Sequence, residues 1–332
     1  MSDSQHTVIE NINAKVTAAP HIRDRRSSTS IMLDVIIALS PAMLLVMFDF
    51  GIAAAAIIVV SVASCMYFEF MYKALLKKPM HKGDLSPIIT GILLAFCVPP
   101  TLPVWMVVVG AFVAIIVVKQ LFGGLGQNFL NPALAAWAFL LAAYHGSMTD
   151  YTFGLYPDVT TMPTPLAIAA FVTEPTLSDI WGVLWGYGST RGAIGETATI
   201  LIILGGIYLL IRKVIKWYIP VSFIGSAALL IFIFGGGDGL FTGVPQYDIF
   251  VGAIILGAFF MATDYTTSPM TKWGQIIFGT GCGVITVIIR LWGGLPEGVA
   301  YAILLMNLLV PLIDKITTNT AKNKKRKERK YG

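Results

Sequence analysis

Long apolar runs recur along almost the whole chain, and they constrain the fold more than any other feature. Several runs approach or exceed about 18 residues, the length that crosses a hydrocarbon core as a helix. Only 12% of the 332 residues are charged, about half the share found in an ordinary soluble domain. A soluble globular fold is therefore excluded, because the polar residues are too few to cover a water-facing surface.

Each of these runs is expected to be a helix rather than a strand, because backbone amides in lipid need internal hydrogen-bond partners. The sequence thus predicts an all-α integral membrane protein with about ten transmembrane helices. The third and fifth spans are short and carry Gly or Pro at their edges, which is typical of helices that line sites inside membrane proteins. The expected spans are 31–48, 50–72, 86–98, 103–121, 130–144, 198–212, 216–234, 247–263, 273–290 and 297–313.

Basic residues alternate between successive connections, as the positive-inside rule requires. The outer connections contain only Arg191, with Arg290 at one edge. Eight or twelve spans would also return the basic tail to the cytoplasm, but this alternation fits ten best. We therefore expect both termini to be cytoplasmic. The inner connections then carry Lys73, Lys77, Lys78, Lys82, Lys119, Arg212, Lys213, Lys216 and Lys272.

The net charge of +5 comes largely from two basic runs that flank the spans, at residues 23–26 and 322–330. Such runs are typical topology determinants, and they favour anionic lipid headgroups or an acidic partner subunit over nucleic acid. The three cysteines, Cys65, Cys97 and Cys282, are far apart and form no C-x-x-C pair. This chain alone therefore offers no metal or iron–sulfur site, which leaves only a cluster shared with another subunit.

An internal repeat relates the two halves of the chain. Residues 121–126 (Leu-Phe-Gly-Gly-Leu-Gly) resemble residues 291–296 (Leu-Trp-Gly-Gly-Leu-Pro), and each segment follows a span that ends in a basic residue. Because five spans per half is an odd number, the halves would form two inverted five-helix repeats. The expected organisation is a polar cytoplasmic arm (1–30), a first repeat (31–144), an extracytoplasmic loop (145–197), a second repeat (198–314) and a basic cytoplasmic tail (315–332).

The long outer connection ends in Ser-Thr-Arg-Gly-Ala-Ile-Gly-Glu-Thr-Ala-Thr over residues 189–199. Gly192 and Gly195 would let the backbone approach a ligand closely. Arg191 could pair with phosphate oxygens, and a helix N-terminus attracts phosphate. A helix N-cap with a flexible glycine turn explains the same residues without a ligand, so the residues alone leave both interpretations open.

A second candidate set lies on the predicted inner side. Asp264 follows the eighth span, among hydroxyl-bearing residues of segment 263–268. A carboxylate at membrane depth is a functional candidate by default, and this one could bind a flavin ring or a hard cation such as Na⁺. A helix-end cap is the alternative. Asn128 and Asn131 either line a pocket or cap the fifth span ahead of Pro132.

Three separated segments resemble motifs of the RnfD/NqrB family, in the order in which that family carries them. Residues 192–197 (Gly-Ala-Ile-Gly-Glu-Thr) look like its covalent-flavin motif. Residues 122–133 are similar to its Gly-Gly-Asn-Pro segment, and residues 260–264 to its Met-Ala-Thr-Asp segment. The resemblance covers roughly residues 30–315. The basic tail and the Gly-Glu-Thr form are more similar to RnfD than to NqrB.

This resemblance implies a function and cofactors. It implies an electron-transfer subunit of a ferredoxin:NAD⁺ oxidoreductase (Rnf) complex in the bacterial cytoplasmic (inner) membrane, coupled to Na⁺ or H⁺ translocation, with the A, B, C, E and G subunits as partners. FMN would be held by a phosphoester to Thr197, with Thr199 as the fallback and with Glu196 in the binding motif. The resemblance leaves room for a second, non-covalent riboflavin beside Asn128, Asn131 and Asp264.

Two other classes of protein fit part of the pattern. No Rossmann glycine fingerprint is present in the sequence, so NAD and ferredoxin are expected to react on other subunits. A cofactor-free secondary transporter or channel would explain inverted repeats and short helices equally well. A structural membrane scaffold is the third class. Bound flavin distinguishes the first interpretation from the other two.

Overall fold

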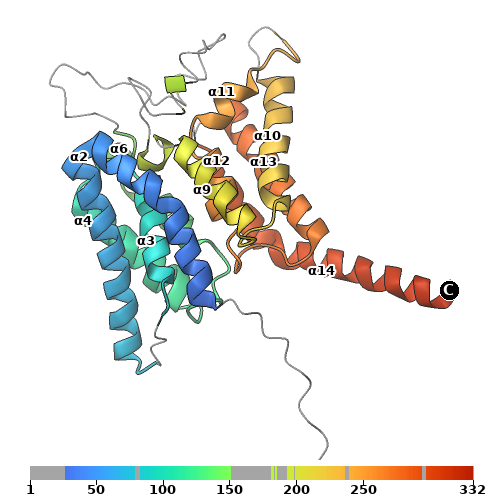
Figure 1. The fold of residues 1–332 in the computed structure, drawn as a ribbon, viewed down its shortest axis with the longest axis horizontal. Coiled ribbons are helices and arrows are strands. Elements are labelled where there is room, and N and C mark those ends of the chain that lie inside the picture. Colours follow the sequence, from blue (N-terminus) through green and yellow to red (C-terminus); the bar gives the residue numbers. More distant parts are fainter. Residues whose placement is uncertain are drawn as a thin grey trace, which may run out of the picture.

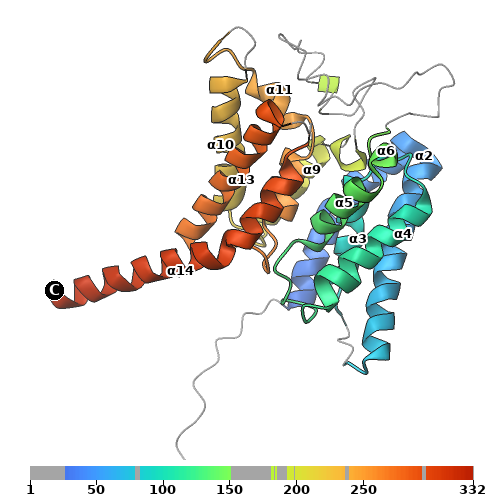
Figure 2. The ribbon, with the colours of Figure 1, turned by 180° about the vertical axis from the view of Figure 1, so that it is seen from behind.

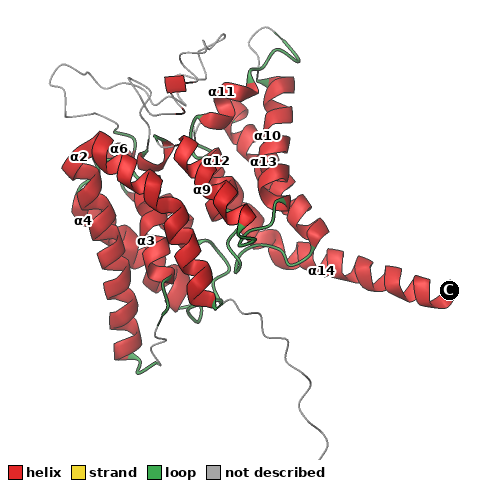
Figure 3. Ribbon diagram, viewed as in Figure 1, coloured by secondary structure: helices red, strands yellow, loops and turns green. Residues whose placement is uncertain are grey.

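The computed structural model describes residues 27–78, 83–150, 181–182, 184, 193–197, 199–235, 239–293 and 297–331. Within these residues the chain is helical and contains no strand (Figure 3). Three of the described helices are long and apolar enough to cross a membrane: α2 (Ser28–Leu75), α13 (Lys272–Trp292) and the part of α14 (Val299–Tyr331) up to Thr318. The prediction of an all-α membrane protein is confirmed at this level.

Shorter apolar helices accompany the long ones. They are α3 (Ser86–Cys97), α4 (Val104–Phe112) continued by the π-helix η1 (Val113–Gln120), α5 (Pro132–Ala143), α9 (Thr199–Ile211) and α10 (Tyr218–Phe234). Both α3 and α5 have only 12 residues, as the Gly and Pro residues at their edges predict. The short α6 (His145–Met148) follows α5.

Helix α2 contains two of the predicted spans, joined by a sharp turn at Gly51. Gly51 has φ 63° and ψ −142°, a conformation that glycine adopts without steric cost. The two limbs of α2 therefore run back along each other, with Ser28 and Leu75 at one end of the bundle and Gly51 at the other (Figure 1). We name these ends the Ser28 end and the Gly51 end.

The eighth predicted span, 247–263, is wrong as a continuous helix. The structure has α11 (Pro245–Phe250), α12 (Ile254–Leu256) and the π-helix η3 (Gly257–Met261) in its place. The break falls where Val251 is extended and Gly252 has φ 77°. Arg290 donates to the freed carbonyl groups of Asp248, at 2.7 Å, and Val251, at 3.2 Å. The apolar pattern could not reveal the break, because broken and continuous segments share the same apolar composition.

The described helices form two groups side by side, α2–α6 and α9–α14 (Figures 1 and 2). Helix α9 joins the groups through small residues. A Cβ atom at Gly205 would lie 2.3 Å from the carbonyl oxygen of Ala38 in α2, and one at Gly206 would lie 2.5 Å from the ring of Phe259 in η3. In lipid there is no hydrophobic driving force between helices, so helices associate through close packing of this kind.

Helices α10 and α13 also pack along a stripe of small residues. A Cβ atom at Gly279 would lie 2.0 Å from Ser222 Oγ and 2.8 Å from the carbonyl oxygen of Ile219, and one at Gly283 would lie 2.0 Å from Ser226 Oγ. The four-residue spacing on both helices is the small-xxx-small pattern of membrane helix pairs. The spacing allows no added methyl group on this face of α13.

We expect Gly279→Ala to destabilise the folded protein by about 1–3 kcal/mol, the usual cost of overpacking a close contact. The measurement is the melting temperature of the purified protein in detergent. Gly225→Ala on α10 is the matched control, because a Cβ atom there meets nothing within 4 Å. Equal melting temperatures for the two variants would contradict the packing described above.

Candidate functional site

A cavity of about 370 Å³ lies between the two helix groups at the Ser28 end. Its lining is mainly apolar with a few converging polar groups, the usual composition of a small-molecule site. Apolar residues from both groups contribute, including Val35, Leu93, Phe259 and Phe260. The polar side chains that line it are Ser28, Ser86, Thr90, Lys119, Asn128, Asn131, Thr263, Asp264, Tyr265 and Thr266.

Asn131 lines this cavity and joins the two helix groups. Its Oδ1 accepts hydrogen bonds from the backbone N–H groups of Ala133, at 3.0 Å, and Leu134, at 3.3 Å, and so caps α5. Its Nδ2 donates to the carbonyl oxygen of Met261, at 3.1 Å, at the end of η3. The two sequence interpretations, cap and pocket wall, therefore both describe the position of this residue.

Asn307 of α14 extends the same connection. With its amide oriented so that both ends are paired, its oxygen accepts from the backbone N–H of Asn131 at 3.2 Å and its nitrogen donates to the carbonyl oxygen of Thr267 at 3.1 Å. Asn307 is 2% exposed. Asn307 was not among the residues predicted from the sequence, although a lone amide inside an apolar span is a detectable signal.

Asn128 and Asp264 line the cavity from opposite helix groups. Asn128 Nδ2 donates only locally, to the carbonyl oxygen of Leu130 at 3.1 Å. Asp264 Oδ2 accepts from the hydroxyl groups of Thr266, at 2.8 Å, and Thr267, at 3.3 Å. Two of the hydroxyl groups that the sequence offered as ligands thus bond to the carboxylate itself, while the Thr263 hydroxyl donates to the carbonyl oxygen of Phe259 at 2.6 Å.

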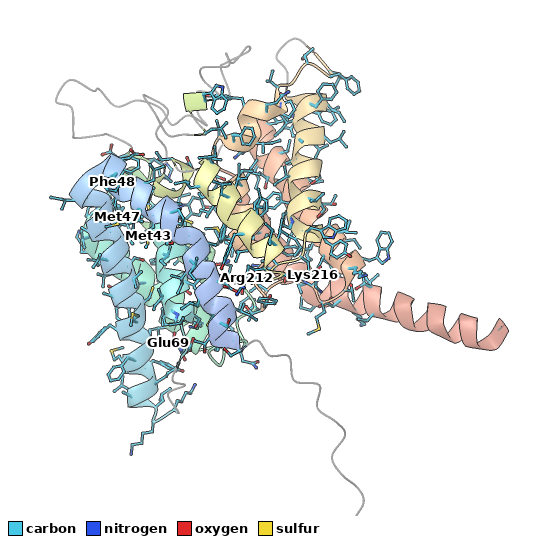
Figure 4. All side chains as sticks on the ribbon, viewed as in Figure 1. Met43, Met47, Phe48, Glu69, Arg212 and Lys216 are labelled. Carbon is cyan, nitrogen blue, oxygen red and sulfur yellow. The ribbon has the colours of Figure 1, made fainter. Side chains whose placement is uncertain are left out.

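Lys119 lines the cavity as well, which the sequence did not predict. The charge pattern assigned Lys119 to a cytoplasmic connection, but its side chain is 3% exposed. Its Nζ donates to Glu69 Oε2 and to Ser86 Oγ, both at 2.6 Å. Lys119 is therefore part of a buried ion pair at the Ser28 end, where Figure 4 also shows Glu69.

The ion pair belongs to a larger network. Lys73 Nζ lies 2.6 Å from Glu69 Oε1 and 3.2 Å from Asp84 Oδ2, and the Ser86 hydroxyl donates to Asp84 Oδ1 at 2.6 Å. Burial alone would raise the pKa of Asp84, which precedes α3, but hydrogen bonds from Ser86 and the charge of Lys119 lower it to about 2. Two ammonium groups thus balance two carboxylates, which is what permits such burial.

The flavin-like motif lies at the Gly51 end. Ala193–Thr197 includes the short 3-10 helix η2 (Ile194–Glu196), and α9 begins at Thr199. Thr197 is 1% exposed, and its hydroxyl makes one long hydrogen bond of 3.5 Å to the carbonyl oxygen of Ala193. The Thr199 hydroxyl donates to the carbonyl oxygen of Glu196 at 2.9 Å. Thr197 therefore has the less committed hydroxyl of the two.

Gly195 has a packing role that the sequence analysis did not predict. A Cβ atom there would lie 2.8 Å from Phe96 Cβ and 2.9 Å from Leu256 Cδ2, and the N–H of Ile194 donates to the carbonyl oxygen of Val98 at 3.3 Å. This glycine thus lets η2 fit between α3 and α12. Arg191 and Gly192, the other predicted residues of the motif, lie outside the described residues.

Acidic and basic side chains gather beside Thr197. Glu196 accepts from the backbone N–H of Ala193 at 3.3 Å. Removal from water raises the pKa of Glu196, and the carboxylate of Glu297 adds to this shift, while the hydrogen bond from Ala193 and the charge of Arg290 oppose it. Arg290 Nη2 lies 4.0 Å from Glu297 Oε2. The raised pKa shifts Glu196 toward its neutral form, which limits the negative charge next to Thr197.

The two candidate sites are separated by the length of α3. Ser86 begins this helix at the cavity, and Val98 follows its last residue at the flavin-like motif. Twelve residues span about 18 Å at the rise of an α-helix. The described residues contain no group of three or more His, Cys, Asp or Glu side chains that could hold a metal ion. The cavity and the flavin-like motif are therefore two distinct places in the fold.

Known proteins resemble this chain over nearly all its length. The family model described as "NQR2, RnfD, RnfE family" matches residues 15–323. The D subunit of the Na⁺-translocating ferredoxin:NAD⁺ oxidoreductase complex of Acetobacterium woodii is 43% identical over 324 residues, which cover 98% of this chain and 97% of that protein. The D subunit of the proton-translocating ferredoxin:NAD⁺ oxidoreductase complex of Clostridium ljungdahlii is 42% identical and covers 91% of this chain and 94% of its own length.

A more distant relative, the D subunit of the ion-translocating oxidoreductase complex of Vibrio atlanticus, is 34% identical and covers 91% of this chain and 97% of its own length. These relatives are subunits of redox-driven ion translocases. The match to the family model and the near-complete coverage by relatives more than 30% identical lead to one conclusion. The chain belongs to the NQR2, RnfD, RnfE family.

Proposed function

We propose that this chain is the membrane electron-transfer subunit of an ion-translocating ferredoxin:NAD⁺ oxidoreductase complex, with FMN esterified to Thr197. The observation that carries the proposal is the similarity, over nearly the full length, to proteins named as the D subunit of such complexes. Those two relatives are named for different ions at almost equal identity to this chain, so the ion is Na⁺ or H⁺. The A, B, C, E and G subunits are the proposed partners.

Membrane topology forms part of the proposal: about ten crossings in two inverted halves, in the bacterial inner membrane, with both termini in the cytoplasm. Matching contacts in the two helix groups support the inversion. Lys119, near the end of η1, reaches Ser86 at the start of α3. Arg290, near the end of α13, reaches the backbone around Val251 ahead of α12. The first contact lies at the Ser28 end and the second at the Gly51 end.

Two observations support Thr197 as the attachment residue. Its hydroxyl makes only a long hydrogen bond, and it lies just ahead of α9. A phosphate ester there would lie near a helix N-terminus, which favours negative charge. Attachment joins Thr197 Oγ to the FMN phosphorus of FAD, breaks the pyrophosphate P–O bond and releases AMP and the hydroxyl proton. Because Thr197 is buried, we infer that a transferase acts before this segment packs against α3.

The cavity at the Ser28 end is the proposed place of a second, non-covalent flavin. Its volume of about 370 Å³ is within the range of small-molecule sites, roughly 300–1,000 Å³. The aromatic and aliphatic walls suit a flat ring system. The amide of Asn128, which caps no helix, offers a hydrogen-bonding group to the ring. A bound flavin would supply one- and two-electron chemistry, while the chain orients it and excludes water.

We expect Thr197→Val to abolish covalent flavin in this subunit, because valine keeps the shape of threonine without the hydroxyl. The measurements are flavin fluorescence of the denatured subunit in a gel and mass analysis of the peptide containing residue 197. Thr199→Val is the matched control and keeps the modification. Flavin retained on the Thr197→Val subunit would exclude Thr197, and absence of flavin from the wild type would favour a cofactor-free transporter.

We expect Asn128→Ala to weaken retention of the non-covalent flavin roughly fivefold, for the loss of one hydrogen bond worth about 1 kcal/mol. The measurement is the flavin released into the supernatant when the purified complex is precipitated with acid, while covalent FMN stays in the pellet. Ser226→Ala, at the contact of α10 with α13, is the control. Unchanged released flavin in Asn128→Ala would place the second flavin elsewhere.

A further inference from the structure

Lys119 is the only lysine or arginine among the described residues that line the cavity, and Asp264 is the only acidic one. The two residues belong to different helix groups, Lys119 to η1 and Asp264 to the loop after η3. A ligand in the cavity would therefore lie between a positive wall and a negative wall. Between mainly apolar walls such charges act with less screening by water than they would at an open surface.

The ammonium group of Lys119 is held firmly. Glu69 Oε2 and Ser86 Oγ each accept a hydrogen bond from Nζ at 2.6 Å. Glu69 is also paired through its other oxygen with Lys73, at 2.6 Å. Of the four charged groups in this network, Lys119 alone lines the cavity. The network is neutral in sum, but it presents its positive member to the ligand space.

Both helix groups have a π-helical backbone where they border the cavity. Lys119 lies in the π-helix η1 (Val113–Gln120), and Phe259 and Phe260 line the cavity from the π-helix η3 (Gly257–Met261). π-Helical turns are rare and occur frequently at functional sites. Two such turns, one from each helix group, border the same cavity. This is independent of the charge argument and points to the same place.

We propose that Lys119 compensates the negative charge that an isoalloxazine ring in this cavity acquires on reduction, and so raises its midpoint potential. The inference rests on the proposed second flavin. A ring that takes two electrons and one proton gains one negative charge, which the ammonium group can balance without a second proton. The electrons come from one-electron carriers of the complex, the iron–sulfur class, and the proton comes from water.

The charged and titratable groups around Lys119 decide which variant can serve as the control. Cys65, Glu69 and Lys73 of α2 and Asp84 ahead of α3 surround it, and Asp264 and Tyr265 lie on the cavity wall of the other helix group. Replacing Lys119 leaves Glu69 paired with Lys73 alone. Lys73→Met is therefore the matched control, because it removes the other ammonium group from the same carboxylate without touching the cavity.

The experiment is a spectroelectrochemical titration of the acid-extractable flavin in the intact purified complex. We expect Lys119→Met to lower the ratio of reduced to oxidised flavin at fixed potential at least tenfold at pH 7, a shift of about 30 mV for a two-electron couple. The midpoint potential of the flavin should fall by about 30 mV per pH unit in the wild type and by about 59 mV per pH unit in Lys119→Met. The slope doubles because the reduced ring takes up a second proton when the ammonium charge is missing. Lys119→Arg should keep the wild-type values.

Lys73→Met should also keep the wild-type potential and slope. If Lys119→Met does not fold, the double variant Glu69→Gln/Lys119→Met also removes the carboxylate charge that Lys119 balanced, and it should show the same tenfold change. A wild-type midpoint potential and pH slope in Lys119→Met or in the double variant, with normal flavin content, would overturn the proposed role of Lys119. That result would leave the proposal of a second flavin intact. A wild-type complex without extractable flavin would overturn the second flavin and this inference together.

Discussion

The amide side chain of Asn131 hydrogen-bonds both helix groups and satisfies backbone atoms of each. It caps α5 of one group and donates to the carbonyl oxygen of Met261 in the other, while Asn307 bonds its backbone. Short and broken helices leave backbone groups unpaired at membrane depth, where each unpaired group costs several kcal/mol. Hydrogen bonds between the groups satisfy these atoms, so the helix ends that need partners also form the walls of the cavity.

The same requirement governs the charged residues. At the Ser28 end, Glu69 and Asp84 are matched by Lys73 and Lys119. At the Gly51 end, Arg290 is shared between Glu297 and carbonyl oxygens of the broken segment. A basic side chain near the end of a long helix thus stabilises the start of a short or broken one in each group. The two candidate sites lie beside these two charged clusters, at opposite ends of α3.

Much of the helical architecture could be predicted, because apolar runs and lipid leave the backbone few alternatives. The grouping of Asn128, Asn131 and Asp264 on one side also followed from span counting, and the structure brings all three to one cavity. The break at Gly252 could not be predicted, since apolar composition does not distinguish a broken helix from a straight one. Lys119 was assigned to a connection because a charge pattern records position along the chain but not burial.

The sequence by itself determined that the chain is a helical membrane protein, where most of its helices begin and end to within a few residues, and which motifs resemble a flavin-binding family. Local composition decides these properties. The tertiary structure alone decided that Lys119 faces a cavity, that Gly195 serves packing between α3 and α12, and that Thr197 keeps the freer hydroxyl. Those facts depend on which distant residues meet, and contacts across the helix groups have no local signature in the chain.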